Sequence, residues 1–327
     1  MNSTMLQSRL DSFDCYKSMQ EFGDVFIDAL PKHIGNLKIP GRVILQNHRR
    51  QPVLANVAHV SDIQDSMREV LNHSITQEAQ LHTENAFRAF LKKSIVDPGI
   101  LKFFNGWNET HKTTSLVSAK IIMRLSADAI SVPAEKQILY SNVMAHMHEV
   151  AKDDFGLGHP GHDGMYEYMT SAFGATAWVE HQYRIPECNE FSGFLYNTGI
   201  AEHKSALNST EHKSSIMDAM MVSIASELWN GREYNFIAQY IEAKLLAINP
   251  LLNASVHNLR NAKGYVLGHS GEVENKHGLH ALAAAQAYGR TVDFPFKLGR
   301  LKGIMLNYNE RVGRAFEAMY QNLSNEN

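Results

Sequence analysis

The segment from residue 214 to residue 229 constrains the fold more than any other part of the chain. Its sequence, SSIMDAMMVSIASELW, is apolar almost all round at helical spacing, which is typical of a buried helix. Glu227 lies in the most apolar part of this segment, MMVSIASELW, between Ile224 and Leu228. An ionised carboxylate is costly to bury unless a cation or hydrogen-bond donors compensate it. The segment therefore predicts a helical core in which Glu227 needs a partner.

Helical spacing dominates the rest of the sequence, so we expect an all-α fold. The segments expected to be helical are Thr76–Ser94, Thr114–Ala129, Ala134–Asp153, His162–Phe173, Tyr234–Ile248, Ala262–Tyr288 and Arg300–Leu323. Residues 156–161 (GLGHPG) contain too much glycine and proline for a helix interior and predict a loop. The only strand-like stretch is Gly41–Val60, which could form a small hairpin.

The first part of the chain differs from the remainder. Residues 1 to about 75 lack sustained helical patterning, and we expect a small, partly irregular N-terminal extension packed on a helical domain of residues 76–327. A length of 327 residues suits one large domain with such an appendage.

The composition excludes several classes of protein. A net charge of -3, with no basic block, argues against binding to nucleic acid. No stretch approaches 18 uninterrupted apolar residues, so we expect no membrane span. The N-terminus has no apolar signal core, and two cysteines are too few for a disulfide framework, so we expect a cytoplasmic protein.

Acidic residues and histidines occur together at three places on or beside helices expected to be buried. They are Asp153, Asp154 and His162 around the GLGHPG loop, Glu227 in the apolar helix, and His269, Glu274 and His277 in the segment YVLGHSGEVENKHGLHALAAAQAY. Seventeen histidines in the whole chain make such groupings more frequent, but their positions matter more than their number.

The spacing of Glu274 and His277 indicates a metal site. An i, i+3 pair lies on one face of a helix, and helix bundles build di-iron sites from Glu residues and Glu-x-x-His pairs that project inward. Mixed oxygen and nitrogen ligands suit iron or manganese better than a thiolate-seeking metal. Each group also has a simpler interpretation: Glu227 could pair with an arginine, His162 could cap a helix, and His277 and His280 could be surface residues.

Two motifs resemble those of a known family. The run KDDFGLGHPGHDGMYEYMTSAFG resembles the second core helix junction of the haem-oxygenase-like di-iron oxidases and oxygenases, in which a glycine-rich turn precedes a metal-binding histidine. The run HSGEVENKHG resembles the His-x-x-x-Asp-x-x-His motif on that family's last core helix. The resemblance covers roughly residues 80 to 290 and implies a haem-oxygenase-like helical bundle.

The resemblance also implies a ligand set. Asp154, His162 and His269 would bind one iron, whereas Glu227, Glu274 and His277 would bind the other. The metals would be two irons, or iron and manganese, since both accept these ligands. Asp153 and His280 are second-rank candidates.

Two departures from the family pattern affect this set. Asp154 stands where a glutamate is usual, which shortens the reach of the side chain. His269 precedes Glu274 by five residues rather than four, which is about 100° out of place on a regular helix. A π-bulge could restore the register. Otherwise His280, one turn beyond His277, becomes the substitute ligand.

The favoured function is that of a non-haem di-iron oxidase or oxygenase, with dioxygen as co-substrate. The resemblance suggests N-oxygenation of an amine, oxidative C–C cleavage of an amino acid, or decarboxylative desaturation of a fatty acid. We expect a small-molecule substrate, an external reductant and a homodimer. The residues expected to line the substrate pocket are aromatic, although core packing is the commoner role of such residues: Phe103, Phe104, Trp107 and Tyr166.

Other functions are weighed against this one. A metal-free helical protein that binds a small ligand could use the same fold. Thiaminase-type relatives use a cysteine nucleophile, but we expect neither Cys15 nor Cys188 on a core helix. A ferritin-like protein would show two Glu-x-x-His pairs, and only one is well placed here. No Walker loop, dinucleotide-binding glycine pattern, zinc-protease motif or nucleophile elbow is present.

Overall fold

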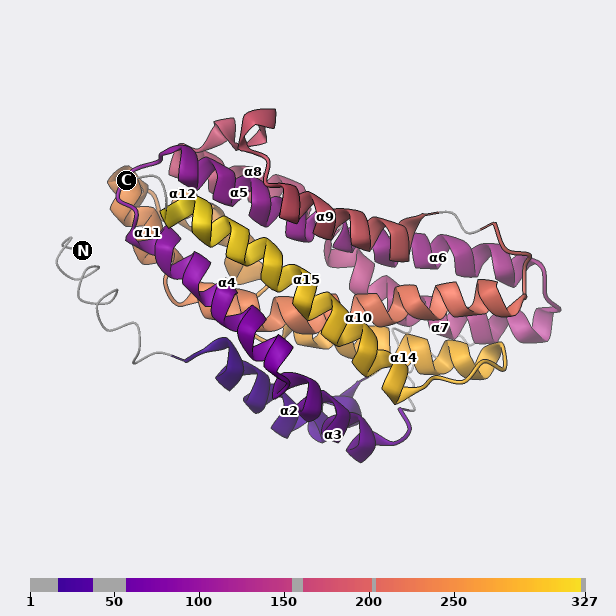
Figure 1. Ribbon diagram of the computed structural model, residues 1–327. Helices are drawn as coiled ribbons and strands as arrows, with labels where there is room; N and C mark the ends of the chain where they lie inside the picture. The colour runs from indigo at the N-terminus through magenta and orange to yellow at the C-terminus, as the bar shows by residue number, and fades with distance from the viewer. Residues whose placement is uncertain (1–16, 38–56, 155–160, 202–203, 325–327) are drawn as a thin grey trace.

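The computed structural model describes residues 17–37, 57–154, 161–201 and 204–324, which form an elongated bundle of helices (Figure 1). No strand occurs among these residues, so the prediction of an all-α fold is confirmed. The loop predicted at residues 156–161 and the strand-like residues 41–56 lie outside the described part, apart from Gly161. Residues 57–59 form no strand, and Val60 begins a helix.

The helices of the described part follow in this order along the chain. In the first half they are α2 (Met19–Asn36), α3 (Val60–Leu71), α4 (Ser74–Lys92), α5 (Pro98–His111), α6 (Thr114–Ile130), α7 (Ala134–Asp154) and α8 (His162–Phe173). In the second half they are α9 (Pro186–Leu195), α10 (Thr210–Ala238), α11 (Ile241–Ile248), α12 (Val256–Ala262), α13 (Gly264–Gly268), α14 (Val273–Thr291) and α15 (Leu298–Ser324). Short 3₁₀ turns η3 (Thr176–Val179), η4 (His181–Tyr183) and η6 (Pro250–Ala254), and a π-helical turn η5 (Tyr196–Ile200), complete the order.

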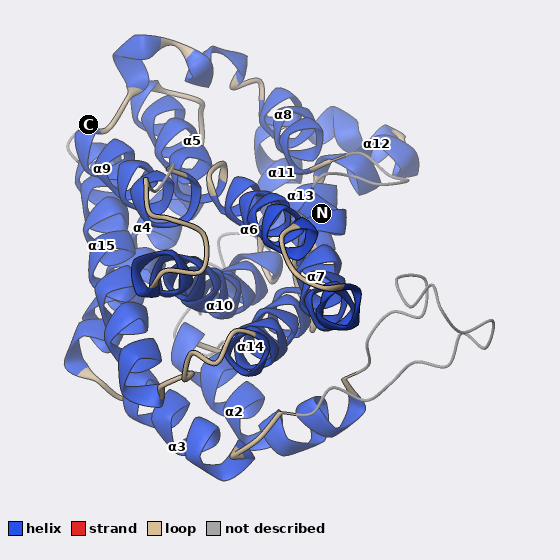
Figure 2. Ribbon diagram, turned by 90° about the vertical axis from the view of Figure 1, so that its right-hand side faces the viewer, coloured by secondary structure: helices blue, strands red, loops and turns tan. Residues whose placement is uncertain are grey.

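Helix α10 runs through the middle of the bundle, with α6, α14 and α15 around it (Figure 2). Its N-cap Ser209 accepts a hydrogen bond from His212 N, which satisfies one free amide of the first turn. From Ile216 to Ile237 almost every side chain is buried. The apolar run that predicted a buried helix therefore lies at the centre of the core, and the helix is longer than residues 214–229.

Helices α4 and α15 lie side by side at unusually short range (Figure 1). A Cβ atom added to Gly313 on α15 would lie 2.7 Å from Cβ of Ala79 on α4. In the same interface, Asn309 Nδ2 donates a hydrogen bond of 2.8 Å to Thr76 Oγ1. The small residues allow the contact, and the buried polar pair fixes its register.

The prediction for the first 75 residues was wrong in one respect, because two regular helices lie there. Helix α2 begins after Ser18, whose hydroxyl caps Glu21 N, and the buried Phe26 and Leu30 of α2 join the main core. Glu84 of α4 accepts a hydrogen bond of 2.9 Å from Met19 N. The division of the chain at residue 75 stays a prediction.

Two predicted helices are interrupted. The expected helix over 234–248 is split at Gln239 and Tyr240, where α10 ends and α11 begins. The expected helix over 262–288 is split into the end of α12, the short α13 and α14, with a turn over residues 269–272. Gly271 has φ +74° in this turn, a left-handed conformation that favours glycine.

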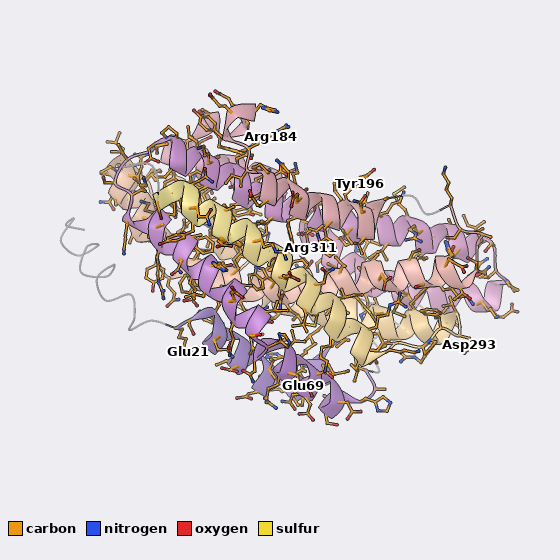
Figure 3. The ribbon with its side chains drawn as sticks, viewed as in Figure 1. Glu21, Glu69, Arg184, Tyr196, Asp293 and Arg311 are labelled. Atoms are coloured by element: carbon orange, nitrogen blue, oxygen red, sulfur yellow. The ribbon has the colours of Figure 1, made fainter. Side chains whose placement is uncertain are left out.

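Charged side chains lie on the surface of the described part. Side chains such as Glu69 on α3 and Arg311 on α15 project from the outside of the bundle (Figure 3). Among the described residues, no helix is both long and apolar enough to cross a membrane.

Candidate metal centre

Six helices, and the residue that caps α13, bring polar side chains to one small interior cavity. Its volume is about 10 Å³, roughly the space of one water molecule. The cavity is lined by His111, Thr114, Ser115, Asp154, His162, Glu227, Asn230, Tyr234, His269 and Glu274. Five of the six predicted metal ligands are in this set, although they span 121 positions of the sequence (154 to 274, counted inclusively). The sixth, His277, contacts two of them.

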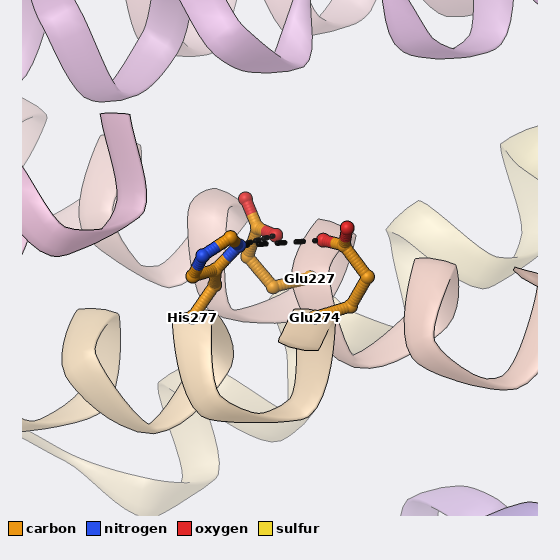
Figure 4. Close-up of side chains that lie close together, drawn as sticks. All are labelled: Glu227, Glu274 and His277. Atoms are coloured by element: carbon orange, nitrogen blue, oxygen red, sulfur yellow. Dashed lines mark ion pairs between the residues drawn. The ribbon is translucent and has the colours of Figure 1, made fainter. Parts of the chain in front are cut away.

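The closest group is formed by Glu227 on α10 with Glu274 and His277 on α14 (Figure 4). His277 Nδ1 lies 3.6 Å from Glu227 Oε2 and 3.6 Å from Glu274 Oε2. One ligand atom from each of the three residues lies within 4.8 Å of the others. Ligand atoms about 2.0–2.2 Å from one cation would be slightly closer together, so a small inward movement would suffice.

These three side chains are almost completely buried. Burial raises the pKa of Glu227 to about 8, and the neighbouring Glu274 carboxylate adds to the effect, whereas His277 opposes it. Glu274 Oε1 is buried and has no hydrogen-bond partner among the described residues. Such an atom costs free energy unless something compensates it. A cation between the three side chains would do so, and the donor set of two carboxylates and an imidazole fits iron or manganese.

Two further imidazoles face the same cavity. The rings of His162 on α8 and His269 have centroids 4.9 Å apart. Burial lowers the pKa of His269 to about 4 and also lowers the pKa of His162 well below its usual value. His269 Nδ1 lies 2.6 Å from the carbonyl oxygen of Tyr265. If Nδ1 carries the proton, as this contact requires, Nε2 keeps its lone pair for a metal.

A turn, not a π-bulge, brings His269 to the cavity. His269 caps the short helix α13, and the turn with Gly271 separates it from Glu274 on α14. Residues 269 and 274 therefore need not share a helix face. The π-bulge that could have restored the register does not occur over residues 264–291, and a π-helical turn occurs instead at Tyr196–Ile200.

The structure separates His269 from its alternative, His280. His280 on α14 is buried, but it pairs with His146 on α7, with their Nδ1 atoms 3.0 Å apart. It is not among the residues that line the cavity. Asp154, at the end of α7, does line it. Asp153 also belongs to α7, but its side chain is outside the described part.

Two residues beside the site, His111 and Glu233, were not among the predicted site residues. His111 Nε2 lies 3.2 Å from Glu233 Oε1, and its Nδ1 lies 2.9 Å from the carbonyl oxygen of Trp107. Burial lowers the pKa of His111, but the charge of Glu233 and its hydrogen bond outweigh burial, so that the pKa is raised overall. Both ring nitrogens of His111 are engaged by other residues, so His111 lines the cavity but is not expected to bind a metal.

Glu233 is held in turn by two indoles. Trp107 Nε1 donates to its Oε1 at 2.7 Å, and Trp229 Nε1 donates to its Oε2 at 2.9 Å. Glu233 is fully buried. A second carboxylate six residues after Glu227 was visible in the sequence. The signal for His111 was weaker, because nothing distinguished it from the other histidines at helix ends.

The four aromatic residues expected around a substrate pocket are packed together in the core. Phe103, Phe104, Trp107 and Tyr166 are at most 1% exposed, and none lines the cavity described above. Phe103 and Trp107 have ring centroids 5.7 Å apart, and Tyr166 donates a hydrogen bond of 2.6 Å to the carbonyl oxygen of Phe104. Contact with a substrate stays a prediction for these residues.

The expectation for Cys188 was wrong, because this residue lies on helix α9 and is completely buried. Its Sγ contacts the carbonyl oxygen of Ala315 at 3.6 Å. Burial raises the pKa of the Cys188 thiol well above its usual value, so the nucleophilic thiolate is disfavoured. A thiaminase-type role for Cys188 gains no support from this position. Cys15 is outside the described residues.

Comparisons with known proteins identify no relative. No protein-family model, curated protein or solved structure matches the chain. The candidate function therefore depends on the geometry of the cavity and on the motif resemblance.

Proposed function

We propose that this protein holds two metal ions, iron or iron with manganese, and uses them to activate dioxygen for the oxidation of a small substrate. The observation that carries the proposal is the convergence of Asp154, His162, Glu227, His269 and Glu274 on one buried cavity, with His277 against two of them. Uncompensated acids are rarely buried in this way, whereas metal-binding acids are.

The ligands divide into two groups by position. Glu227, Glu274 and His277 would hold one ion, since their ligand atoms already lie within 4.8 Å of one another. Asp154, His162 and His269 would hold the second ion. Glu227 and Glu274 of the first group line the same cavity as Asp154, His162 and His269.

The bound metals would supply the electrons that reduce dioxygen. The chain's own residues would control the surroundings. The carbonyl oxygen of Tyr265 fixes the orientation of the His269 ring, and the buried helices exclude bulk water. His111, whose Nε2 is held by Glu233, lines the cavity and would hold or release a proton at that atom.

The motif resemblance supports the haem-oxygenase-like form of this function. It favours an amine, an amino acid or a fatty acid as substrate, with N-oxygenation, C–C cleavage or desaturation as the reaction. An external reductant, a homodimer and a cytoplasmic location belong to the same proposal.

Metal loading tests the proposal directly. Metal-free protein is loaded with ferrous iron without oxygen, and the bound iron is counted by elemental analysis. We expect about two irons per chain, and consumption of oxygen when air is admitted. Glu227→Ala and His277→Ala should each lose most of the iron. His257→Ala, at an exposed histidine, is the control and should keep it.

The main alternative is a metal-free helical protein that binds a small organic ligand. A stable wild-type protein that takes up at most one iron per chain, and consumes no oxygen, would favour this alternative over the proposal. Retention of iron in both Glu227→Ala and His277→Ala would show that the metal binds elsewhere.

A further inference from the structure

A second cavity lies on the other side of α10 and α14, where helices α2 and α3 cover the bundle. It is lined by Gly23, Phe26, Ile27, Met67, Val70, Leu71, Leu228, Arg232, Asn275 and Met305. None of these residues lines the metal cavity. The lining is apolar except for two side chains, Arg232 and Asn275. The volume is about 30 Å³, enough for a carboxylate group. The cavity is partly open to solvent, so an alkyl chain attached to that group can extend along the lining.

Arg232 carries the positive charge of this cavity, and it is only 7% exposed. Its Nε donates to the carbonyl oxygen of Leu228 at 3.2 Å, and its Nη1 donates to Gln80 Oε1 at 2.7 Å. Both acceptors are neutral. Nη2 makes no hydrogen bond, and the guanidinium has no ion pair, with any residue that the structure describes. Arg232 therefore lacks the anion that a buried guanidinium normally has.

The nearest acid does not fill this role. Glu233 follows Arg232 in the sequence and interacts with it electrostatically, but both of its oxygens are occupied by other donors. Trp107 and His111 contact Oε1, and Trp229 contacts Oε2. The Arg232 guanidinium instead lies 4.9 Å from the Trp229 ring, an interaction that stabilises a cation but does not neutralise it.

The backbone of α2 comes unusually close to this arginine. A Cβ atom added to Gly23 would lie 3.1 Å from Cδ of Arg232 and 2.8 Å from Cδ1 of Leu71. Glycine at this position keeps the space beside the Arg232 stem open. The apolar side chains of Phe26, Met67 and their neighbours then surround that space.

We propose that this cavity is a binding site for a small aliphatic carboxylic acid, whose carboxylate pairs with Arg232 and whose alkyl group contacts the apolar lining. A guanidinium binds a carboxylate through two parallel hydrogen bonds, and Arg232 has Nη2 free for one of them among the described groups. An inorganic anion would satisfy the charge but leave the apolar walls without a partner. The site does not depend on the metal centre.

Calorimetric titration of the full-length protein with butyrate tests this proposal. We expect butyrate to bind about tenfold or more tightly than 1-butanol, which has the same alkyl chain without the charge. Sodium chloride and inorganic phosphate should not displace butyrate at equal concentration. Equal binding of butyrate and 1-butanol, or equal binding of phosphate, would overturn the proposal.

Two variants locate the site. Arg232→Met should reduce butyrate affinity by about tenfold or more, and Arg124→Met should leave it unchanged. Arg124 is a matched control because it is a partly buried arginine outside the cavity, and its Nη2 donates to Ser215 Oγ. Undiminished binding in Arg232→Met would place the ligand elsewhere.

Two further measurements keep the test decisive. If Arg232→Met does not fold, Gly23→Ala should still fold and weaken butyrate binding by narrowing the space beside Arg232. Unchanged affinity in Gly23→Ala would count against this cavity.

Butyrate should also bind equally to metal-free protein and to Glu227→Ala, so that failure of the metal proposal leaves this result unaffected. Loss of butyrate binding in both would mean that the ligand occupies the metal cavity.

Discussion

Glu227 and His277 face each other across the contact between α10 and α14, with Glu227 Oε2 3.6 Å from His277 Nδ1. The two residues are 50 positions apart in the sequence (277 minus 227), and both are nearly inaccessible to solvent. Neither side chain could be kept in the core by apolar packing alone. Their proximity makes the α10–α14 contact the centre of the candidate metal site.

Replacing Glu227 by glutamine should stabilise the metal-free protein at high pH. Burial raises the pKa of Glu227 to about 8 in the folded state, above about 4.3 when unfolded. The folded state therefore binds more protons than the unfolded state between these values, so stability falls as pH rises through the window. Urea unfolding of wild-type protein at pH 5 and pH 8 measures this loss, on the order of 1.4 kcal/mol per pH unit.

Glu227→Gln should remove most of that pH dependence. Glu211→Gln is the control, since Glu211 is an exposed glutamate on the same helix. The interpretation fails if the wild-type protein and Glu227→Gln lose the same stability between pH 5 and pH 8. Metal bound at the site should suppress the wild-type loss, because a cation favours the ionised carboxylate.

The paired histidines His146 and His280 should make the protein sensitive to acid. Burial lowers the pKa of His146 to about 4 and the pKa of His280 to about 3, with Lys152, Lys276 and Arg290 acting in the same direction and Glu149 opposing it at His146. The unfolded state takes up protons below about pH 6.5, whereas the folded state does not until lower pH. Stability is therefore present above pH 6.5 and is lost as pH falls below it.

The expected slope is about 1.4 kcal/mol per pH unit for each histidine below pH 6. His280→Asn removes one of the two titrating groups and should reduce the slope by about half. Urea unfolding between pH 4.5 and pH 7 measures the slope of the free energy of unfolding against pH. His181→Asn, at an exposed histidine, is the control. An unchanged slope in His280→Asn would contradict the assignment.

Glu233→Gln should change the charge of His111 without dismantling the cavity. Burial lowers the pKa of His111, and Glu233 is the main group that raises it. Removal of that negative charge should bring the pKa of His111 below its usual value. Nuclear magnetic resonance of the imidazole during a pH titration reports this directly, and Glu242→Gln is the control. A His111 pKa that stays high in Glu233→Gln would mean that another group sets its charge.

Glu233→Gln should also lower stability, by about 1–3 kcal/mol, because glutamine cannot accept hydrogen bonds from both indoles and the imidazole through two oxygens. The change should appear in urea unfolding at pH 7. A neutral effect would indicate that Trp107 and Trp229 find other acceptors.

The close contact between α4 and α15 predicts opposite effects for two glycines on α15. Gly313→Ala would place a Cβ atom 2.7 Å from Cβ of Ala79, and should destabilise the protein by about 1–3 kcal/mol. A Cβ atom added at Gly303 would have no other atom within 4 Å, so Gly303→Ala should stabilise the protein by about 0.5–1 kcal/mol. Thermal unfolding of the two variants checks the interface, and equal effects would contradict the close packing.

Much of the candidate site was predictable because its residues follow local rules. The i, i+3 spacing of Glu274 and His277 is sufficient to put them on one face of a helix. Glu227 was identifiable as a carboxylate in an apolar run. His269 was harder, because a helical register misplaces it and the turn at Gly271 depends on backbone conformation. His111, at the end of α5, and Glu233, on α10, meet only in the tertiary structure, which no local pattern describes.

The amino-acid sequence by itself determined the helical class, most helix positions and the acids and imidazoles that must be compensated, because periodicity and the cost of buried charge are local properties. The tertiary structure alone decided which of them meet. It places His269, and not His280, at the cavity, and it pairs Glu233 with His111. It also leaves the Arg232 guanidinium, beneath α2, without an anionic partner among the described residues. These outcomes depend on how distant helices pack, and a distance between two helices is not encoded in either one alone.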